Sequence, residues 1–475
     1  MKKIKDFLSK NKDILIVFFI ILFTIMLPYM QNDFIIGDDY EYHFSRIQSI
    51  KEALEEGIFP VKVHPKLANG YGYGSGLFYP NLFLYIPAIL CLMGLNFFVS
   101  YKIFIAIMLL LMFVLTYKSL KSIVEDKTTT LIGVAVIMLS SCLSLHLLKR
   151  VALGEFLGFI FIAPVIAGIH DYIHNDFKKP WLLFIGFFGL INSHLITTAI
   201  CTVYCVIVFL FNIKTSLKNP KKMLKLFFVA VLVALTTAYF WMPMLEQMIG
   251  YKFKYSNQWT SAKDNVFGAY DLFGPQKYSL GILITICFPM IIVGMFEKVS
   301  KKAKIFSLMF LILVIIMLCP AIWNWTDSIT GGIQFKWRLL GITTVLAGIS
   351  ISMLLKEYCE NNNVNPKYIL IIFVALSMFI FNFQYTDLDT APESFVESKM
   401  YSLWNSIGGG CEYLPLEMNV GNLGYPQFAI ADDGEKILYA LDTIVIRCKY
   451  YNEEELLHLL KNLVGKDYEI KKINI

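Results

Sequence analysis

Charged residues are scarce in this sequence. Only 16% of its 475 residues are charged, whereas 57% are hydrophobic, and the mean hydropathy is +0.60. Soluble proteins carry about 25% charged residues, so this composition excludes an ordinary soluble enzyme and indicates an integral membrane protein. The net charge of +6 is small, and the lysines cluster in short segments between apolar runs. That pattern is typical of membrane topology and not of nucleic-acid binding.

Two signals of other protein classes are also missing. The apolar run Ile14–Asn32 has no small-residue cleavage site, so we expect an uncleaved first helix with its preceding lysines in the cytoplasm. The 9 cysteines show no zinc-type spacing, and most lie in apolar runs, where a thiol acts as a small hydrophobe. Only Cys411 and Cys448 lie in a polar region, where a disulfide and two free thiols are both open alternatives.

Uncharged runs that can cross a bilayer, about 20 residues each, recur along the chain. The lysine-rich connections fall on one side only if Leu77–Tyr101 is a re-entrant or surface helix and not a full crossing. We therefore predict an all-α polytopic membrane protein with about 11 transmembrane helices. Counting Leu77–Asn96 as a span adds one crossing and inverts every later loop. After the first run, the expected spans are Phe97–Tyr117, Thr128–Leu148, Phe156–Ile173, Trp181–Ile191, Leu195–Phe211, Leu226–Leu245, Tyr278–Phe296, Ile305–Trp323, Leu339–Leu355 and Tyr368–Tyr385.

The chain divides into a transmembrane domain, residues 1–385, and an extracytoplasmic C-terminal tail, residues 386–475. The tail is polar, and we expect a small α+β unit there. Its predicted elements are a strand within Asp442–Tyr450, a capped helix at Asn452–Leu463 and a strand-like end at Tyr468–Ile475.

The first outer loop, residues 31–76, carries the densest group of reactive side chains. Asp38 and Asp39 are adjacent carboxylates, followed by His43 and Arg46. Positions i, i+4 and i+7 share a helix face, so Asp39, His43 and Arg46 are expected to point the same way. Two carboxylates and a histidine could also hold a divalent metal, and the sequence leaves metal dependence open.

Further polar residues lie at predicted span ends on the same side, and His194 lies at the apex of a predicted hairpin. A polar apex is unfavourable against lipid, so this apex should face a hydrated cavity. Ionisable groups at membrane depth cost about 2.5–3.5 kcal/mol each, so their convergence indicates function. Each has a structural alternative: interface anchoring for the arginines, helix packing for the histidine, or simply ending a helix. The set is Arg150, Glu155, His194, Glu246, Lys336 and Arg338.

Several motifs resemble a known family. GDDYEYHFSRI and the later GYGYGSGLFYP look like the first outer loop of bacterial GT-C superfamily membrane glycosyltransferases. The branch they resemble is labelled 6-pyruvoyl-tetrahydropterin synthase-related membrane protein. RVALGEFLGFIFIAPV, SHLITT, FWMPMLE, QFKWRLL and CEYLP follow in the same order, so the resemblance extends to about Pro415.

This resemblance implies a GT-C-like fold and a glycosyltransferase of the cell (plasma) membrane. A polyprenyl-phosphate sugar donor would enter from the lipid bilayer, and an extracytoplasmic acceptor would receive the sugar with inversion. The family's loop aspartate corresponds to Asp39. Taken with the chemistry of the polar residues above, this predicts a set of site residues. The predicted catalytic residues are Asp39, Asp38, His43, Glu155 and His194, and the predicted substrate-binding residues are Arg46, Tyr79, Arg150, Glu246, Lys336 and Arg338. The alternative is a non-catalytic lipid or polysaccharide translocator, or a scaffold of cell-envelope assembly.

Overall fold

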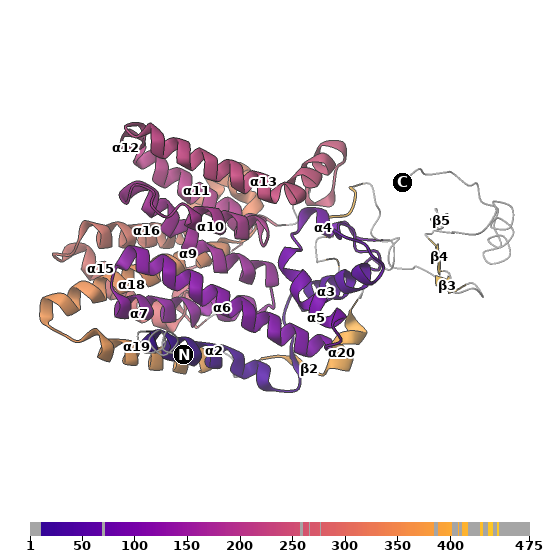
Figure 1. Cartoon of the computed structure of the whole chain (residues 1–475), viewed down its shortest axis with the longest axis horizontal. Helices are drawn as coiled ribbons and strands as arrows, with labels where there is room; N and C mark the ends of the chain where they lie inside the picture. The colour runs from indigo at the N-terminus through magenta and orange to yellow at the C-terminus, as the bar shows by residue number, and fades with distance from the viewer. Residues whose placement is uncertain are drawn as a thin grey trace, which may run out of the picture.

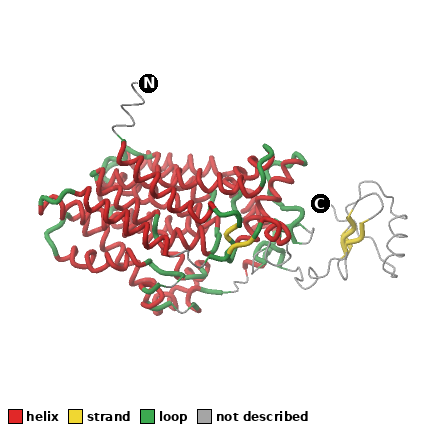
Figure 2. The backbone as a smooth tube through the Cα atoms, turned by 90° about the horizontal axis from the view of Figure 1, so that it is seen from below, coloured by secondary structure: helices red, strands yellow, loops and turns green. Residues whose placement is uncertain are grey.

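Figure 1 shows the computed structural model of the chain, an elongated bundle of helices that carries shorter helices at one end. Figure 2 shows the long helices side by side along the long axis. The structure describes residues 11–68, 72–256, 260–265, 267–275, 277–383, 388–400, 407 and 411–416, and the backbone of three later strands.

Within these described residues, seven helical segments are long and apolar enough to cross a membrane, or up to eight if one bent pair counts as a span. The predicted multi-pass, mostly helical membrane protein is therefore confirmed, whereas the count of about eleven spans stays a prediction. The segments are α2 (Lys12–Met26) with η1 (Leu27–Met30); α6 (Phe97–Val124); α7 (Lys127–Met138) with α8 (Ser141–Ser144) and η3 (Leu145–Lys149); α9 (Leu153–His174); α13 (Pro220–Gly250); η7 (Lys336–Leu339) with α18 (Leu340–Asn362); and α19 (Pro366–Phe383).

Shorter apolar helices complete the bundle. The predicted hairpin is present: α10 and α11 have the expected bounds, and residues 192–194 form the apex between them. The predicted span Ile305–Trp323 is wrong at its end. A bend of 88° follows α16, because Pro320 lacks an N–H to continue the helix and starts the next one instead. These helices are α10 (Trp181–Ile191), α11 (Leu195–Phe211), α12 (Ile213–Leu217), α15 (Ile282–Phe296), α16 (Lys301–Leu318) and α17 (Pro320–Thr330).

Helix α9 lies at the centre of the membrane bundle. Every residue from Leu153 to Ile173 is buried, and the helix packs against α6, α10, α11 and α18. Small residues permit this packing: a Cβ on Gly168 would meet Leu183 of α10 at 2.7 Å. The first turn of α9 contains Glu155, so the central helix delivers a carboxylate to one end of the bundle.

The lysine-rich connections meet at the opposite end of the bundle. Lys302 donates to the carbonyl oxygen of Ile123 at 2.8 Å, and Lys356 donates to that of Val124 at 3.1 Å. Lys225 donates to the Phe177 carbonyl at 2.7 Å. These contacts join connections far apart in sequence, as the alternation of lysine groups predicts. They place the basic loops together and away from Glu155.

Short elements cover the other end of the bundle. Strand β1 (Phe34–Ile35) pairs antiparallel with β2 (Thr390–Ala391), which ties the first loop to the chain beyond the last membrane helix. Residues 77–96 form no single long helix, since the apolar helix there covers only Leu82–Leu92. The remaining elements here are α3 (Tyr40–Glu55), α4 (Ser75–Phe78), η2 (Leu82–Leu84), α5 (Tyr85–Leu92), η4 (Lys254–Ser256), η5 (Ala262–Asp264), α14 (Ala269–Phe273), η6 (Gly331–Ile333) and α20 (Glu393–Lys399).

The tail contains one sheet in the order β3-β4-β5, with both pairs antiparallel. Strand β5 falls within the predicted strand 442–450. The predicted helix 452–463, the predicted strand 468–475 and Cys448 lie outside the described residues. The strands are β3 (Phe428–Ile430), β4 (Lys436–Tyr439) and β5 (Ile444–Val445).

Candidate functional site

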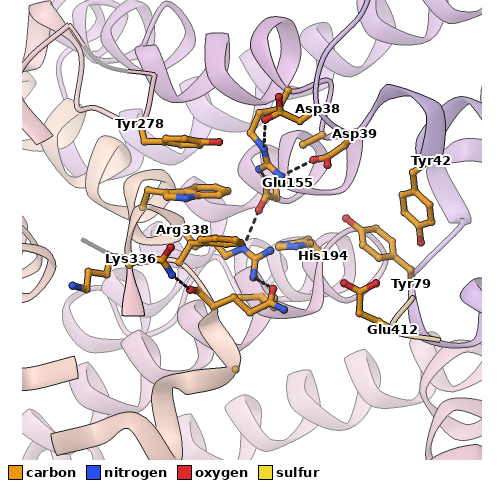
Figure 3. Close-up of a pocket in the computed structure, with 18 of the residues that line it drawn as sticks. Asp38, Asp39, Tyr42, Tyr79, Glu155, His194, Tyr278, Lys336, Arg338 and Glu412 are labelled. Atoms are coloured by element: carbon orange, nitrogen blue, oxygen red, sulfur yellow. Dashed lines mark hydrogen bonds and ion pairs between the residues drawn. The ribbon is translucent and has the colours of Figure 1, made fainter. Parts of the chain in front are cut away.

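A pocket of about 1020 Å³ opens at the end of the bundle covered by the short elements. Its walls come from the first loop, the starts of α9 and α11, η7, the loop after α13, and the segment 411–416. Figure 3 shows the polar side chains that converge there. The predicted site residues that line the pocket are Asp38, Asp39, His43, Tyr79, Arg150, Glu155, His194, Lys336 and Arg338.

Arg150 connects the first loop to α9. Its Nη2 donates to Asp39 Oδ2 at 2.6 Å, its Nη1 donates to Glu155 Oε2, and its guanidinium lies 4.6 Å from the centre of the Trp337 ring. The Asp39 backbone N–H also donates to the Arg150 carbonyl oxygen at 2.8 Å. The side chain is only 11% exposed. Arg150 is therefore held by two carboxylates and a ring, which fixes the geometry of the pocket centre.

The backbone around Arg150 is irregular for a local reason. The π-helix η3 ends just before it, and Val151 has a φ of 54°, so the chain turns sharply before α9 begins. On the facing loop, a Cβ on Gly37 would lie 2.6 Å from the Arg150 carbonyl carbon. Such irregularities are frequent at functional sites. Here they let two chain segments approach closely enough for Arg150 to reach Asp39.

Glu155 binds a second arginine. Arg338 Nε donates to Glu155 Oε1 at 3.1 Å, and Arg338 Nη1 donates to Gln334 Oε1 at 2.6 Å. The Nδ1 of His146 lies 3.3 Å from Glu155 Oε2. The Glu155 side chain is 7% exposed. One buried carboxylate thus positions two arginines, which is the arrangement that satisfies a buried charge.

Asp39 has an unusual electrostatic environment. Burial raises the pKa of its carboxyl from 3.8 to about 6; Arg150 opposes this shift, and the charges of Glu155 and Asp38 add to it. The side chain is nevertheless 33% exposed, so a ligand in the pocket can reach a carboxyl that most of the surrounding protein shields from water. Its Oδ1 accepts no hydrogen bond from any residue in the described ranges. Asp39 is therefore suited to exchange a proton near neutral pH.

Asp38 differs from its neighbour. Lys277 Nζ donates to its two oxygens at 2.7 and 2.8 Å, and Arg150 Nε lies 3.6 Å away. With 47% of its side chain exposed, Asp38 is the more solvated carboxylate. The two aspartates thus have separate main partners: Lys277 binds Asp38, and Arg150 binds Asp39.

His43 and Arg46 lie on the same face of α3, as predicted, but at different depths. His43 lines the pocket, and burial, with Arg46 and Arg150 nearby, holds its pKa well below the ordinary value. Arg46 is 1% exposed and donates to Asn81 Oδ1 at 2.6 Å and to the Pro80 carbonyl at 2.8 Å. Its guanidinium lies 4.5 Å from the Tyr79 ring centre. Arg46 is therefore behind the pocket wall and positions Tyr79.

Tyr79 and His194 reach the pocket through specific local structure. A Cβ on Gly154 would fall 1.8 Å from the Tyr79 hydroxyl, so only glycine leaves room for that ring against the start of α9. His194 is the N-cap of α11, and its Nδ1 lies 2.8 Å from Thr197 Oγ1. The hairpin apex thus both caps a helix and lines the pocket, as the expected hydrated cavity requires.

Lys336 is a buried cation without a partner in the described part of the chain. It is 3% exposed, lines the pocket, and makes no hydrogen bond or ion pair with any other residue that the structure describes. A buried, unpaired ammonium is unfavourable unless an anion joins it. This end of the pocket is therefore suited to an anionic group.

One predicted site residue lies elsewhere. Glu246 is an exposed residue of α13 and does not line the pocket, so the structure does not bring it together with the other predicted site residues. α13 continues to Gly250, and Glu246 therefore does not end its helix either. In the part of the chain that the structure describes, no group of three or more His, Cys, Asp or Glu residues could hold a metal ion.

Sequence reasoning missed much of the pocket wall. Tyr278 stacks on Trp337 with ring centres 4.8 Å apart, and Phe335 stacks on the same indole at 5.3 Å. A run of aromatic residues beside arginine in QFKWRLL was a usable signal for Trp337. The CEYLP motif was the corresponding signal for Glu412. Tyr278 had none, because its distance in sequence from the first loop hides that both line one pocket. The missed lining residues include Tyr42, Lys277, Tyr278, Gln334, Phe335, Trp337, Glu412 and Tyr413.

The family model of DUF6541, a family of unknown function, matches residues 14–334. The chain belongs to this family. The matched region contains the first loop, Arg150, Glu155 and the hairpin apex, and it ends just before Lys336. An uncharacterized protein from Lactococcus lactis subsp. cremoris (strain MG1363) is 25% identical over 254 residues. That alignment covers 52% of this chain and 41% of the relative, so the match spans less than half of the Lactococcus protein.

Proposed function

We propose that this DUF6541 protein is a membrane glycosyltransferase. It moves a sugar from a polyprenyl-phosphate donor to an extracytoplasmic acceptor in the cell envelope, with inversion at the anomeric carbon. The observation that carries the proposal is one pocket at the bundle end that combines Asp39, whose pKa is raised to about 6, with a buried, unpaired Lys336. The resemblance of the loop motifs to GT-C enzymes supports the same reading.

The proposed chemistry follows from these groups. The acceptor hydroxyl attacks the anomeric carbon, the new C–O bond forms, and the bond from that carbon to the phosphate oxygen breaks. Asp39 takes the proton that the hydroxyl loses, a contribution of about 10²–10⁴-fold in rate. The lipid phosphate leaves as an anion. Arg338 and Lys336 line the same pocket, and in this proposal they stabilise the developing charge.

The internal ion pairs support a transferase that is organised before substrate binds. Glu155 and Asp39 hold Arg150, so Arg150 has little freedom left to follow a substrate. Arg338 uses Nε and Nη1 for protein partners, and its Nη2 has none within the described ranges. Lys336 and the Nη2 of Arg338 are therefore the cationic groups open to a phosphate.

The alternative is a translocator without covalent chemistry. Its supporting observation is the 88° break between α16 and α17, because broken helices mark substrate paths in transporters. Transporter folds place such breaks in matching halves, whereas the part of the chain that the structure describes has one such bent helix pair, beside the pocket wall formed by residues 332–338. We favour the transferase for that reason and because of Asp39.

Turnover tests the proposal directly. Purified full-length protein in nanodiscs is incubated with polyprenyl-phosphate sugars and candidate glycan acceptors, and the products are analysed by mass spectrometry. We expect free polyprenyl phosphate and a glycosylated acceptor in equal amounts. Movement of intact donor between leaflets without cleavage would favour the translocator.

The proposal requires the pocket to face outward from the plasma membrane, with the N-terminus cytoplasmic and the C-terminus extracytoplasmic. We predict that a cysteine at Ser256 reacts with a membrane-impermeant maleimide applied to intact cells. A cysteine in the 298–304 loop should react only after permeabilisation. Cys448 lies outside the described residues and is replaced with serine for this experiment; none of the described free cysteines is exposed. Outside labelling of the 298–304 loop contradicts the orientation.

The raised pKa of Asp39 predicts an acid limb in the pH profile. A base must be ionised, so turnover should fall below about pH 6, by tenfold per pH unit, and level off above it. If the base were an aspartate with the ordinary pKa of 3.8, the enzyme would keep full turnover down to about pH 5. The measurement is kcat/KM from pH 4.5 to 8. If kcat/KM does not fall below about pH 6, Asp39 is not the base.

The Arg338 series tests the phosphate contact. A guanidinium donates to two phosphate oxygens at once, whereas an ammonium is a point charge. Arg338→Lys should therefore lose much of the turnover despite its retained charge, and Arg338→Ala should lose more and bind the donor lipid more weakly. If Arg338→Lys has wild-type turnover, Arg338 does not bind the phosphate through its guanidinium, and Lys336 remains as the open cation of the pocket.

A further inference from the structure

We infer that the side of the pocket opposite Lys336 is a carbohydrate subsite for the acceptor, in which the Glu412 carboxylate accepts hydrogen bonds from the hydroxyl groups of a sugar ring. This inference rests on the proposed transferase and names its acceptor class. Glu412 lies in the CEYLP segment, beyond the region that the family model matches.

The pocket has two chemically different sides. Figure 3 shows Lys336 on one side and Tyr42, Tyr79 and Glu412 on the other, with Arg338 and Asp39 between them. A donor phosphate belongs on the cationic side. Because the acceptor hydroxyl must meet Asp39, the rest of the acceptor has to extend away from the phosphate. That direction leads to Glu412.

Backbone hydrogen bonds fix the position of Glu412. The Tyr255 N–H donates to the Glu412 carbonyl oxygen at 2.9 Å, and the Lys254 N–H donates to that of Leu414 at 2.9 Å. The Leu416 N–H donates to the Lys252 carbonyl oxygen at 2.9 Å. Residues 411–416 thus run beside the loop after α13 in a strand-like pairing. Glu412 belongs to the folded wall of the pocket.

Aromatic packing secures the same segment against the first loop. The Tyr413 N–H donates to the Tyr73 hydroxyl at 3.2 Å, and the Tyr413 ring stacks on Phe78 with centres 5.4 Å apart and planes at 5°. Cys411 and Leu414 are buried with Leu67 and Tyr73. This packing therefore holds the backbone at position 412 in a fixed place at the pocket wall.

The Glu412 carboxylate has no partner among the residues that the structure describes. It lines the pocket, yet it makes no hydrogen bond or ion pair with any side chain in the described ranges. An ionised carboxylate only accepts hydrogen bonds, so its ligand must bring donors, and sugar hydroxyl groups do so next to the rings of Tyr79 and Tyr413. An ammonium ligand fits less well. Arg46 already lies 5.2 Å from the Tyr42 ring centre and 4.5 Å from that of Tyr79, which occupies the cation site of this aromatic group.

Ligand-observed NMR of the full-length protein in nanodiscs tests the subsite without requiring turnover. Saturation transfer to a panel of methyl glycosides is measured for wild type, Glu412→Gln, Glu412→Ala and the exposed control Glu397→Gln on α20. We expect at least one methyl glycoside to bind wild type and Glu397→Gln equally. Glu412→Ala should weaken its binding about 10- to 100-fold, as expected for the loss of hydrogen bonds to a charged group. Donor-lipid affinity should stay unchanged.

The kinetic counterpart is a rise in KM for the acceptor in Glu412→Gln, with kcat nearly unchanged. Equal glycoside binding by wild type and both Glu412 variants overturns the inference, and so does a loss of donor affinity in place of acceptor affinity. Binding of choline in preference to every glycoside also overturns it. Failure of the transferase itself gives a different result: glycoside binding that depends on Glu412, but no cleavage of any donor.

Discussion

Replacing Asp39 with asparagine is expected to abolish sugar transfer and leave the folded protein intact. Asparagine keeps the shape and can still accept a hydrogen bond from Arg150, but it cannot take a proton. The loss of a positioned base lowers turnover by about 10²–10⁴-fold. Folding should tolerate the change, because the raised pKa of Asp39 shows that burial already disfavours its charge. The measurements are turnover in nanodiscs and the thermal unfolding midpoint.

Asp38→Asn is the matched control. Asp38 has 47% of its side chain exposed and is bound chiefly by Lys277, so its replacement should lower turnover much less. Both variants remove one negative charge from adjacent positions, which separates base chemistry from a general change in pocket charge. An inactive Asp38→Asn beside a near-normal Asp39→Asn would reverse the assignment.

Glu155→Ala is expected to have the largest effect on stability. The Glu155 side chain is 7% exposed and binds Arg150 and Arg338. Its removal leaves Arg338 without its carboxylate partner and leaves Arg150 to Asp38 and Asp39. Breaking a buried ion pair on one side costs about 3–5 kcal/mol. We expect the free energy of unfolding to fall by about 3 kcal/mol, the lower end of this range, because the pocket admits water. Turnover should fall as well, because Arg150 and Arg338 lose their positions.

Glu246→Ala provides the comparison for that variant. Glu246 is an exposed residue of α13 outside the pocket, and exposed substitutions usually change stability by less than about 0.5 kcal/mol. The two variants should therefore separate clearly in detergent-unfolding midpoints. Equal midpoints would show that the Glu155 ion pairs contribute little to the folded state.

The sequence predicted elements whose signals are local. The hairpin helices α10 and α11 have the expected bounds because an apolar run, a polar apex and flanking lysines define them directly. His43 and Arg46 share a face because helical periodicity requires it. The end of α16 was missed, although Pro320 was visible, because the apolar run continues past the proline and hides the bend.

The contacts that build the site are not local. Asp39 and Arg150 are 111 positions apart, and Glu155 and Arg338 are 183 apart; periodicity carries no information about which helix ends meet. The burial of Arg46 behind Tyr79 depends on its hydrogen bond to Asn81. The position of Glu412 in the pocket wall depends on the pairing of its segment with residues 252–255. Both follow from packing between distant segments, and no pattern in either segment alone indicates them.

Lipid that copurifies with the protein tests the central claim most directly. Wild type, Asp39→Asn and Arg338→Ala are purified in the same mild detergent, and their bound lipids are extracted and analysed by mass spectrometry. We expect a glycosylated polyprenyl phosphate that is enriched in Asp39→Asn, which binds the donor and cannot turn it over, and depleted in Arg338→Ala. Bulk phospholipid alone, in equal amounts from all three proteins, would contradict a lipid-linked sugar donor in this pocket.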